Sequence, residues 1–175
     1  MLHNDPDIRT QSLQKTMQGH AALGVLVGLI GGWFFAFAQL QEVNVWPLFA
    51  FDVNMPGDKH GWAEAHVGPI LNGLLCAFGA SILPRMSGIQ KTMIAYALIA
   101  TVWGNTIFYF CVPFGNVHCL TGGYAKAFGA HGNVFDAIGY VVAVLVAPLT
   151  MASMVMIAIT LLRSDRGTSA PTTAG

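Results

Sequence analysis

The chain has 175 residues, of which 54% are hydrophobic and only 9% are charged, and its mean hydropathy is +0.58. An average soluble domain has roughly a quarter charged residues, so this composition predicts a membrane protein. The eight basic and eight acidic residues give a formal net charge of +0, which argues against electrostatic binding to nucleic acid.

The N-terminal part of the chain predicts a polar lead followed by a first membrane span. Residues 1–19 are polar and contain no cleavable signal peptide. Residues 20–40 include about 20 positions without a charge, enough to cross a hydrocarbon layer roughly 30 Å thick. Glycine recurs at every fourth position of this span, at Gly24, Gly28 and Gly32. Such a stripe allows close packing of a second helix, although glycines are also simply tolerated in membrane helices.

Three further spans are predicted, at residues 63–83, 92–112 and 134–162. Residues 41–60 and 113–133 are rich in glycine, proline and other turn formers, and we expect loops there. Aromatic residues of the first loop are expected in the headgroup region: Trp46, Phe49 and Phe51. Pro148 predicts a kink in the fourth span, and the composition of residues 163–175 predicts disorder.

The basic residues predict the orientation of these spans. Six lie at one end: Arg9, Lys15, Arg85, Lys91, Arg163 and Arg166. Only Lys59 and Lys126 lie at the other end, so both termini are predicted to be cytoplasmic. The sequence therefore predicts an all-α fold, an integral membrane four-helix bundle over residues 20–162 with no soluble domain.

The three cysteines show neither a CxxC motif nor the spacing of a Cys/His metal site. Their odd number argues against a secreted disulfide framework. Cys76 and Cys111 fall within apolar runs, and we expect them to be small core residues.

The second span opens with Gly-Trp-Ala-Glu-Ala-His-Val-Gly-Pro-Ile-Leu-Asn-Gly at residues 61–73, which places Glu64, His66 and Asn72 at its mouth. A polar or ionisable side chain is expensive in a membrane span and is therefore a functional-site hypothesis. His66 lies deepest in its helix among the histidines. A lone neutral imidazole in an apolar cleft suits a metal and can hold haem, whereas a hydrogen-bonded histidine at a helix cap is the alternative interpretation.

Further polar residues lie inside the spans. Asn105 and Tyr109 are four positions apart and share one helix face, where hydrogen bonds between helices are one interpretation. Asn72 follows His66 by about 9 Å along an ideal helix but about 120° around it. Pro69 lies between them, so the spacing leaves open whether both side chains face one pocket.

Residues 61–73 closely resemble the membrane-bound styrene oxide isomerases, whose pattern at this point is G-W-A-x-A-H-x-G-P-x-L-N-G. The third span resembles this family in the pattern W-x-N-x-x-F-Y, carried by Trp103, Asn105, Phe108 and Tyr109. The similarity extends from Met17-x-Gly19-His20 to the fourth span. The loops at residues 41–60 and 113–133 depart from the family pattern.

The resemblance implies a small enzyme of the bacterial inner membrane, a homotrimer in the family, with ferric haem b between neighbouring subunits as a Lewis acid. The implied reaction is the Meinwald rearrangement of an aryl epoxide such as styrene oxide to an aldehyde such as phenylacetaldehyde, a step of styrene degradation. On the matching positions, His66 would be the axial haem ligand, and Asn72 and Tyr109 would line the substrate pocket.

Two other classes of protein remain open from the residues alone. One is a haem-binding electron-transfer subunit like cytochrome b, which usually has two axial protein ligands. The other is a small transporter without a cofactor. Glu64 is expected at most to cap the start of its helix, where a negative charge is favoured, and no role is predicted for His20 or Asp136.

Overall fold

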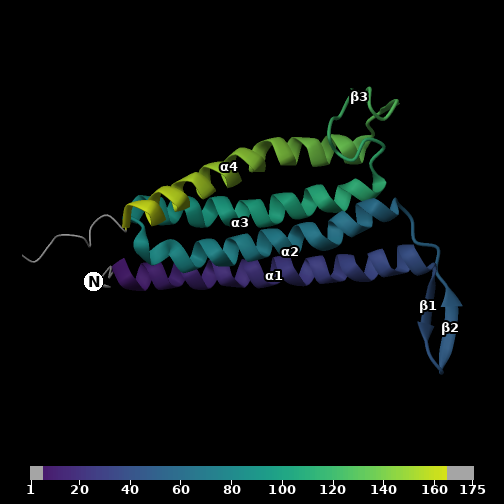
Figure 1. Cartoon of the computed structure of the whole chain (residues 1–175), viewed down its shortest axis with the longest axis horizontal. Coiled ribbons are helices and arrows are strands. Elements are labelled where there is room, and N and C mark those ends of the chain that lie inside the picture. The colour runs from purple at the N-terminus through teal and green to yellow at the C-terminus, as the bar shows by residue number, and fades with distance from the viewer. Residues whose placement is uncertain (1–5, 165–175) are drawn as a thin grey trace, which may run out of the picture.

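The computed structural model describes residues 6–164, and these residues form a bundle of long helices (Figure 1). The α-helices are α1 (Pro6–Leu40), α2 (Lys59–Ile82), α3 (Gly88–Cys111) and α4 (Val134–Ser164). Short 3-10 helices, η1 (Leu83–Arg85) and η2 (Val112–Phe114), follow α2 and α3. All four α-helices are long and apolar enough to cross a membrane, which confirms the predicted all-α membrane bundle. The disorder predicted for the tail falls mostly on residues 165–175, which lie outside the described part.

Successive helices run in opposite directions, so the start of α1, the turn between α2 and α3, and the end of α4 lie together (Figure 1). We call this the basic end, because it carries Arg9, Lys15, Arg85, Lys91 and Arg163. The helix α1 begins at Pro6, so the described part of the predicted lead is helical. Polar contacts attach it to the bundle: the Gln14 amide donates to the Ala80 carbonyl at 2.9 Å, and the Lys91 ammonium to the Thr10 hydroxyl at 2.9 Å.

The glycine stripe of α1 packs directly against α2. A Cβ atom built on Gly28 would lie 2.8 Å from the His66 carbonyl oxygen, and one on Gly31 would lie 2.5 Å from the Ala65 carbonyl oxygen. Both neighbours are backbone atoms, which cannot move aside as a side-chain tip can. The interpretation of the stripe as a close helix contact is therefore confirmed, and the contact is within one chain.

Pro69 explains why one of these contacts involves a carbonyl. Proline has no backbone N–H, so the Ala65 carbonyl four residues earlier has no hydrogen-bond donor within α2. Gly31 of α1 faces that oxygen, because a Cβ added to it would collide with the oxygen. Both α2 and α4 continue as helices through their internal prolines, Pro69 and Pro148.

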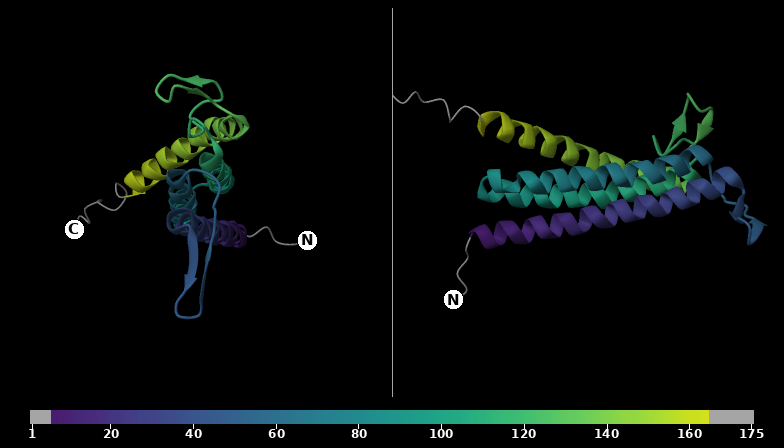
Figure 2. Two further views of the ribbon diagram at one scale, coloured as in Figure 1. Left: turned by 90° about the vertical axis from the view of Figure 1, so that its right-hand side faces the viewer. Right: turned by 60° about the horizontal axis from the view of Figure 1, so that its bottom comes forward.

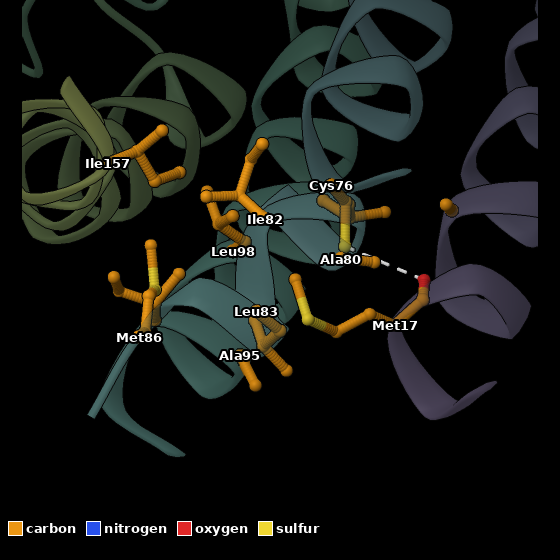
Figure 3. Close-up of a cluster of buried hydrophobic side chains, with 12 residues drawn as sticks. Met17, Cys76, Ala80, Ile82, Leu83, Met86, Ala95, Leu98 and Ile157 are labelled. Carbon is orange, nitrogen blue, oxygen red and sulfur yellow. Dashed lines mark hydrogen bonds between the residues drawn. The ribbon is translucent and has the colours of Figure 1, made fainter. Parts of the chain in front are cut away.

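A buried apolar cluster fills the basic end of the bundle (Figure 3). Its largest fully buried side chains come from α1, α3 and η1: Met17, Leu83, Ile94 and Leu98. Cys76 lies in the same cluster, and its thiol donates to the Met17 carbonyl at 3.6 Å. Cys76 and Cys111 are buried free thiols, which confirms the expectation that they are core residues.

The first predicted loop contains a β-hairpin, β1 (Glu42–Val45) and β2 (Phe49–Asp52), that projects across the long axis of the bundle (Figures 1 and 2). The antiparallel register pairs Val43 with Phe51 and Val45 with Phe49, so these side chains share one face. The opposite face carries Glu42, Asn44, Ala50 and Asp52. The hairpin is thus amphipathic, and Trp46 at its tip is 88% exposed.

The second loop is organised by Asp136 in the first turn of α4. Its buried carboxylate accepts backbone N–H bonds from Asn116 (2.7 Å), Val117 (3.2 Å), Cys119 (2.7 Å) and Asn133 (2.8 Å). A buried carboxylate requires such donors, and these bonds hold the loop against the start of α4. Burial raises the pKa of the Cys119 thiol beside it to about 12, which keeps this thiol un-ionised. The loop also forms a small hairpin, β3 (Tyr124–Ala125) and β4 (Ala130–His131).

The close contact between α1 and α2 predicts opposite outcomes for two glycine substitutions in α1. Gly28→Ala places a methyl group against backbone atoms and should destabilise the protein by about 1–3 kcal/mol. Gly19→Ala is the matched control, because no atom lies within 4 Å of its added Cβ and alanine favours helix more than glycine. Thermal unfolding in detergent measures both. A Gly28→Ala protein as stable as the Gly19→Ala protein would contradict the close contact.

Candidate active site

His66 lies on the face of α2 that meets α1. Its Nδ1 is 2.9 Å from the Gly28 carbonyl oxygen. A carbonyl oxygen can only accept a hydrogen bond, so Nδ1 carries the proton and donates. In a neutral imidazole the other nitrogen, Nε2, then keeps its lone pair. The Nε2 lone pair of His66 is therefore available to a metal.

Glycine at two positions of α1 makes room for this imidazole. A Cβ on Gly32 would lie 2.6 Å from His66 Nδ1, so any side chain at position 32 would displace the ring. Gly28 supplies the accepting carbonyl one turn earlier. The four-residue glycine spacing thus serves both the helix contact and the orientation of His66.

His66 borders an open groove with a volume of about 580 Å³. Strand β1 forms one wall of it and α1 forms the other. The α1 residues are Leu29, Gly32, Trp33, Ala36, Phe37 and Leu40. Its lining is mainly apolar and aromatic, and its size is in the range of cofactor and ligand pockets.

Asn72 of α2 and Tyr109 of α3 lie where these two helices meet. The Tyr109 ring packs on Gly68, where an added Cβ would overlap it. The Asn72 amide donates to the Gly68 carbonyl at 2.8 Å, and its oxygen accepts from the Asn105 amide at 2.8 Å. The predicted interhelical hydrogen bonds of Asn105 are confirmed. Tyr109 and Asn72 thus both contact Gly68.

The structure therefore separates His66 from the other two predicted site residues. Gly68 follows His66 by two positions, about 200° around the helix, so Tyr109 contacts nearly the opposite face of α2. His66 contacts α1, and Asn72 contacts α3. Within one chain the three side chains do not converge on one pocket.

The structure contradicts the role that the sequence suggested for Glu64. Glu64 does not cap α2. The cap is Asp58, whose carboxylate accepts from the Gly61 N–H at 2.8 Å, and Glu64 instead lies 3.3 Å from His60 Nε2. The prediction failed because α2 begins at Lys59, a turn before the expected span. The available signal was Asp58 itself, a preferred N-cap residue just before the span.

His20 has a structural partner that the sequence did not indicate. Its Nδ1 accepts a hydrogen bond from Trp103 Nε1 at 3.0 Å, which joins α1 to α3. His20 and Trp103 are far apart in the sequence, so no local spacing could have revealed this pair. The Gly28 carbonyl was missed for a different reason, because backbone acceptors leave no trace in the sequence.

The styrene oxide isomerase family model matches residues 13–162. The chain belongs to the styrene oxide isomerase family. A curated styrene-oxide isomerase from Pseudomonas fluorescens is 28% identical over 155 residues, which cover 87% of this chain and 90% of that protein. The predicted enzyme class, an isomerase acting on epoxides, is confirmed for this member of the family.

The match places His66, Asn72 and Tyr109 inside the part of the chain that styrene oxide isomerases share. Their individual roles remain predictions. Within residues 6–164, no three His, Cys, Asp or Glu side chains gather to hold a bare metal ion. A prosthetic group held by one axial side chain does not require such a cluster of ligands.

The contact between Asn72 and Asn105 predicts an energetic coupling between α2 and α3. A double-mutant cycle with Asn72→Ala and Asn105→Ala should give a coupling of about 0.6 kcal/mol, the average for hydrogen bonds between membrane helices. Reversible unfolding in detergent provides the measurement. Asn44→Ala, on the exposed hairpin, should show no coupling to Asn72→Ala. Additive effects of the first pair would show that this bond contributes nothing.

Proposed function

We propose that this isomerase converts aryl epoxides such as styrene oxide to aldehydes such as phenylacetaldehyde, with ferric haem b bound through His66. The reaction is a Meinwald rearrangement, in which a C–O bond of the epoxide opens and a hydride moves to the neighbouring carbon. The observation that carries the proposal is the hydrogen bond from His66 Nδ1 to the Gly28 carbonyl, because it leaves Nε2 as a ligand at the edge of an apolar groove.

The residues around His66 fit a haem. Histidines that ligate metals usually donate their other ring N–H to a backbone carbonyl or carboxylate, which fixes the tautomer and the ring orientation. The Gly28 carbonyl is such an acceptor. Gly32 and Ala36 have small side chains that leave space in the groove. Trp33 and Phe37 line it with aromatic rings. An axial nitrogen in an apolar, aromatic groove is the donor set of a haem site.

When bound, ferric haem would supply a Lewis acid for the epoxide oxygen. The rearrangement consumes no water, electron or external proton, so the tasks of the chain are to bind, to orient and to exclude water. The Tyr109 phenol is a hydrogen-bond donor that can orient the epoxide oxygen. The Asn72 amide has a second N–H, because only one is required by the Gly68 carbonyl.

The proposed active site lies between neighbouring copies of the chain in a homotrimer. The support for this is that the two side chains lie on different sides of α2: His66 of α2 faces α1, and Tyr109 of α3 packs against Gly68 of α2. A site containing both then takes His66 from one copy and Tyr109 with Asn72 from the next. The half-open groove beside His66 is the surface that a neighbouring copy would cover.

We place the enzyme in the bacterial inner membrane with both termini in the cytoplasm. Five basic residues gather at the basic end, against Lys59 and Lys126 at the hairpin end. Membrane proteins keep such a cluster on the cytoplasmic side. An apolar epoxide partitions into the bilayer, which supplies it to the enzyme and separates it from aqueous nucleophiles.

His66→Ala is expected to remove both bound haem and turnover, because no other described residue lining this groove is a histidine. The measurements are the Soret absorbance of purified protein and the formation of phenylacetaldehyde from styrene oxide, with and without a reductant. His60→Ala is the matched control, since His60 lies on the same helix with its side chain 76% exposed. Full haem content and turnover in the His66→Ala protein would remove His66 from the proposed role.

A further inference from the structure

A groove between α3 and α4 runs from the basic end into the membrane-spanning part of the bundle. It consists of two cavities in series. One, of about 520 Å³, lies at the helix ends, and the other, of about 340 Å³, lies further along the helices. Met156 lines both, so the two cavities adjoin. Neither involves His66, Asn72 or Tyr109.

The cavity at the helix ends carries basic and other polar side chains. Arg85 at the end of η1 and Arg163 in the last turn of α4 both line it, together with Ser87, Gln90 and Thr160. Among the side chains that the structure describes, the one ion pair joins His60 to Glu64 at the other end of the molecule. None of the described carboxylates therefore pairs with these arginines. Two guanidinium groups with neighbouring hydroxyls are a typical binding site for phosphate oxygens.

The adjoining cavity is apolar. Small residues on the two helices, Ala97, Ala100 and Ala152, form part of its lining. Large side chains at its edges, Met93, Tyr96 and Leu149, are 45–63% exposed in the single chain. This surface lies on helices that cross the membrane, so hydrocarbon rather than water is the medium that it meets.

The dimensions of the groove match one leaflet of a bilayer. From Leu149 to Arg163 the helix α4 rises about 21 Å at 1.5 Å per residue. Half of the hydrocarbon layer is about 15 Å thick, which leaves the remainder at headgroup depth. The arginines therefore lie where a lipid phosphate lies, and the apolar cavity lies where an acyl chain lies.

We propose that this groove is a binding site for one anionic phospholipid. Its phosphate lies between Arg85 and Arg163, and one acyl chain follows the alanines of α3 and α4. Basic pockets between helices at the cytoplasmic side commonly hold anionic headgroups. Free phosphate would leave the apolar cavity unfilled, and a second protein copy would have to supply carboxylates to the arginines. The site is independent of the proposed haem and of the isomerase reaction.

The test compares lipids and variants by native mass spectrometry of the full-length protein in neutral detergent. Phosphatidylglycerol should bind more tightly than phosphatidylcholine. Arg85→Gln with Arg163→Gln should weaken phosphatidylglycerol binding roughly 30-fold, since each basic residue at a headgroup contributes about 1 kcal/mol and 1.4 kcal/mol is tenfold. Lys59→Gln with Lys126→Gln makes the same charge change at the opposite end and should leave binding unchanged.

A second variant tests the acyl-chain part of the groove. Ala100→Leu fills the apolar cavity and should weaken binding while both arginines remain. Equal binding of the two lipids, or unchanged phosphatidylglycerol binding in the arginine variant, overturns the proposal. Displacement of the lipid by inorganic phosphate alone also overturns it. Efficient cross-linking of the Tyr96→Cys variant between two copies of the chain would also overturn it, because a second copy would then cover the groove. The three native cysteines are buried and do not interfere with this assay.

Discussion

The hydrogen bond from His66 Nδ1 to the Gly28 carbonyl is the interaction on which the proposed site depends. It exists only because α1 and α2 approach each other closely enough for the ring to reach a backbone oxygen. The glycines of α1 permit that approach, and Pro69 removes the usual N–H donor to the Ala65 carbonyl, the group next to Gly31. A side chain at Gly32 would displace the imidazole, and one at Gly28 or Gly31 would collide with the α2 backbone that carries it. Helix packing and ligand orientation are therefore one constraint.

Most other polar groups inside the spans are satisfied within the bundle. Asn105 bonds Asn72, and Trp103 bonds His20. Thr101 and Thr150 bond each other at 2.7 Å across α3 and α4. Such bonds contribute modestly but orient the helices. The groups left for a ligand are then few, which suits a rearrangement that needs binding and orientation rather than proton or electron supply.

Hydropathy and charge predicted α2, α3 and α4 to within a few residues at each end, and α1 at its end only, because the membrane imposes length and composition on each span. The polar stretch around His66 and the resemblance it carries predicted the family. The extension of α1 to Pro6 was not predictable, since contacts of Gln14 with another helix stabilise that polar segment. The hairpin escaped prediction because Pro47 and the acidic residues read as a loop. The separation of His66 from Tyr109 needed helix positions that spacing alone does not provide.

The central claim is that His66 of one copy and Tyr109 of its neighbour act in the same site. Co-expression of differently tagged His66→Ala and Tyr109→Phe chains, followed by purification through both tags, tests it directly. Each variant alone should isomerise styrene oxide poorly. Mixed oligomers should recover turnover well above the sum of the two, because some interfaces then combine an intact His66 with an intact Tyr109. Mixed oligomers that stay as inactive as the separate variants would contradict a site shared between copies.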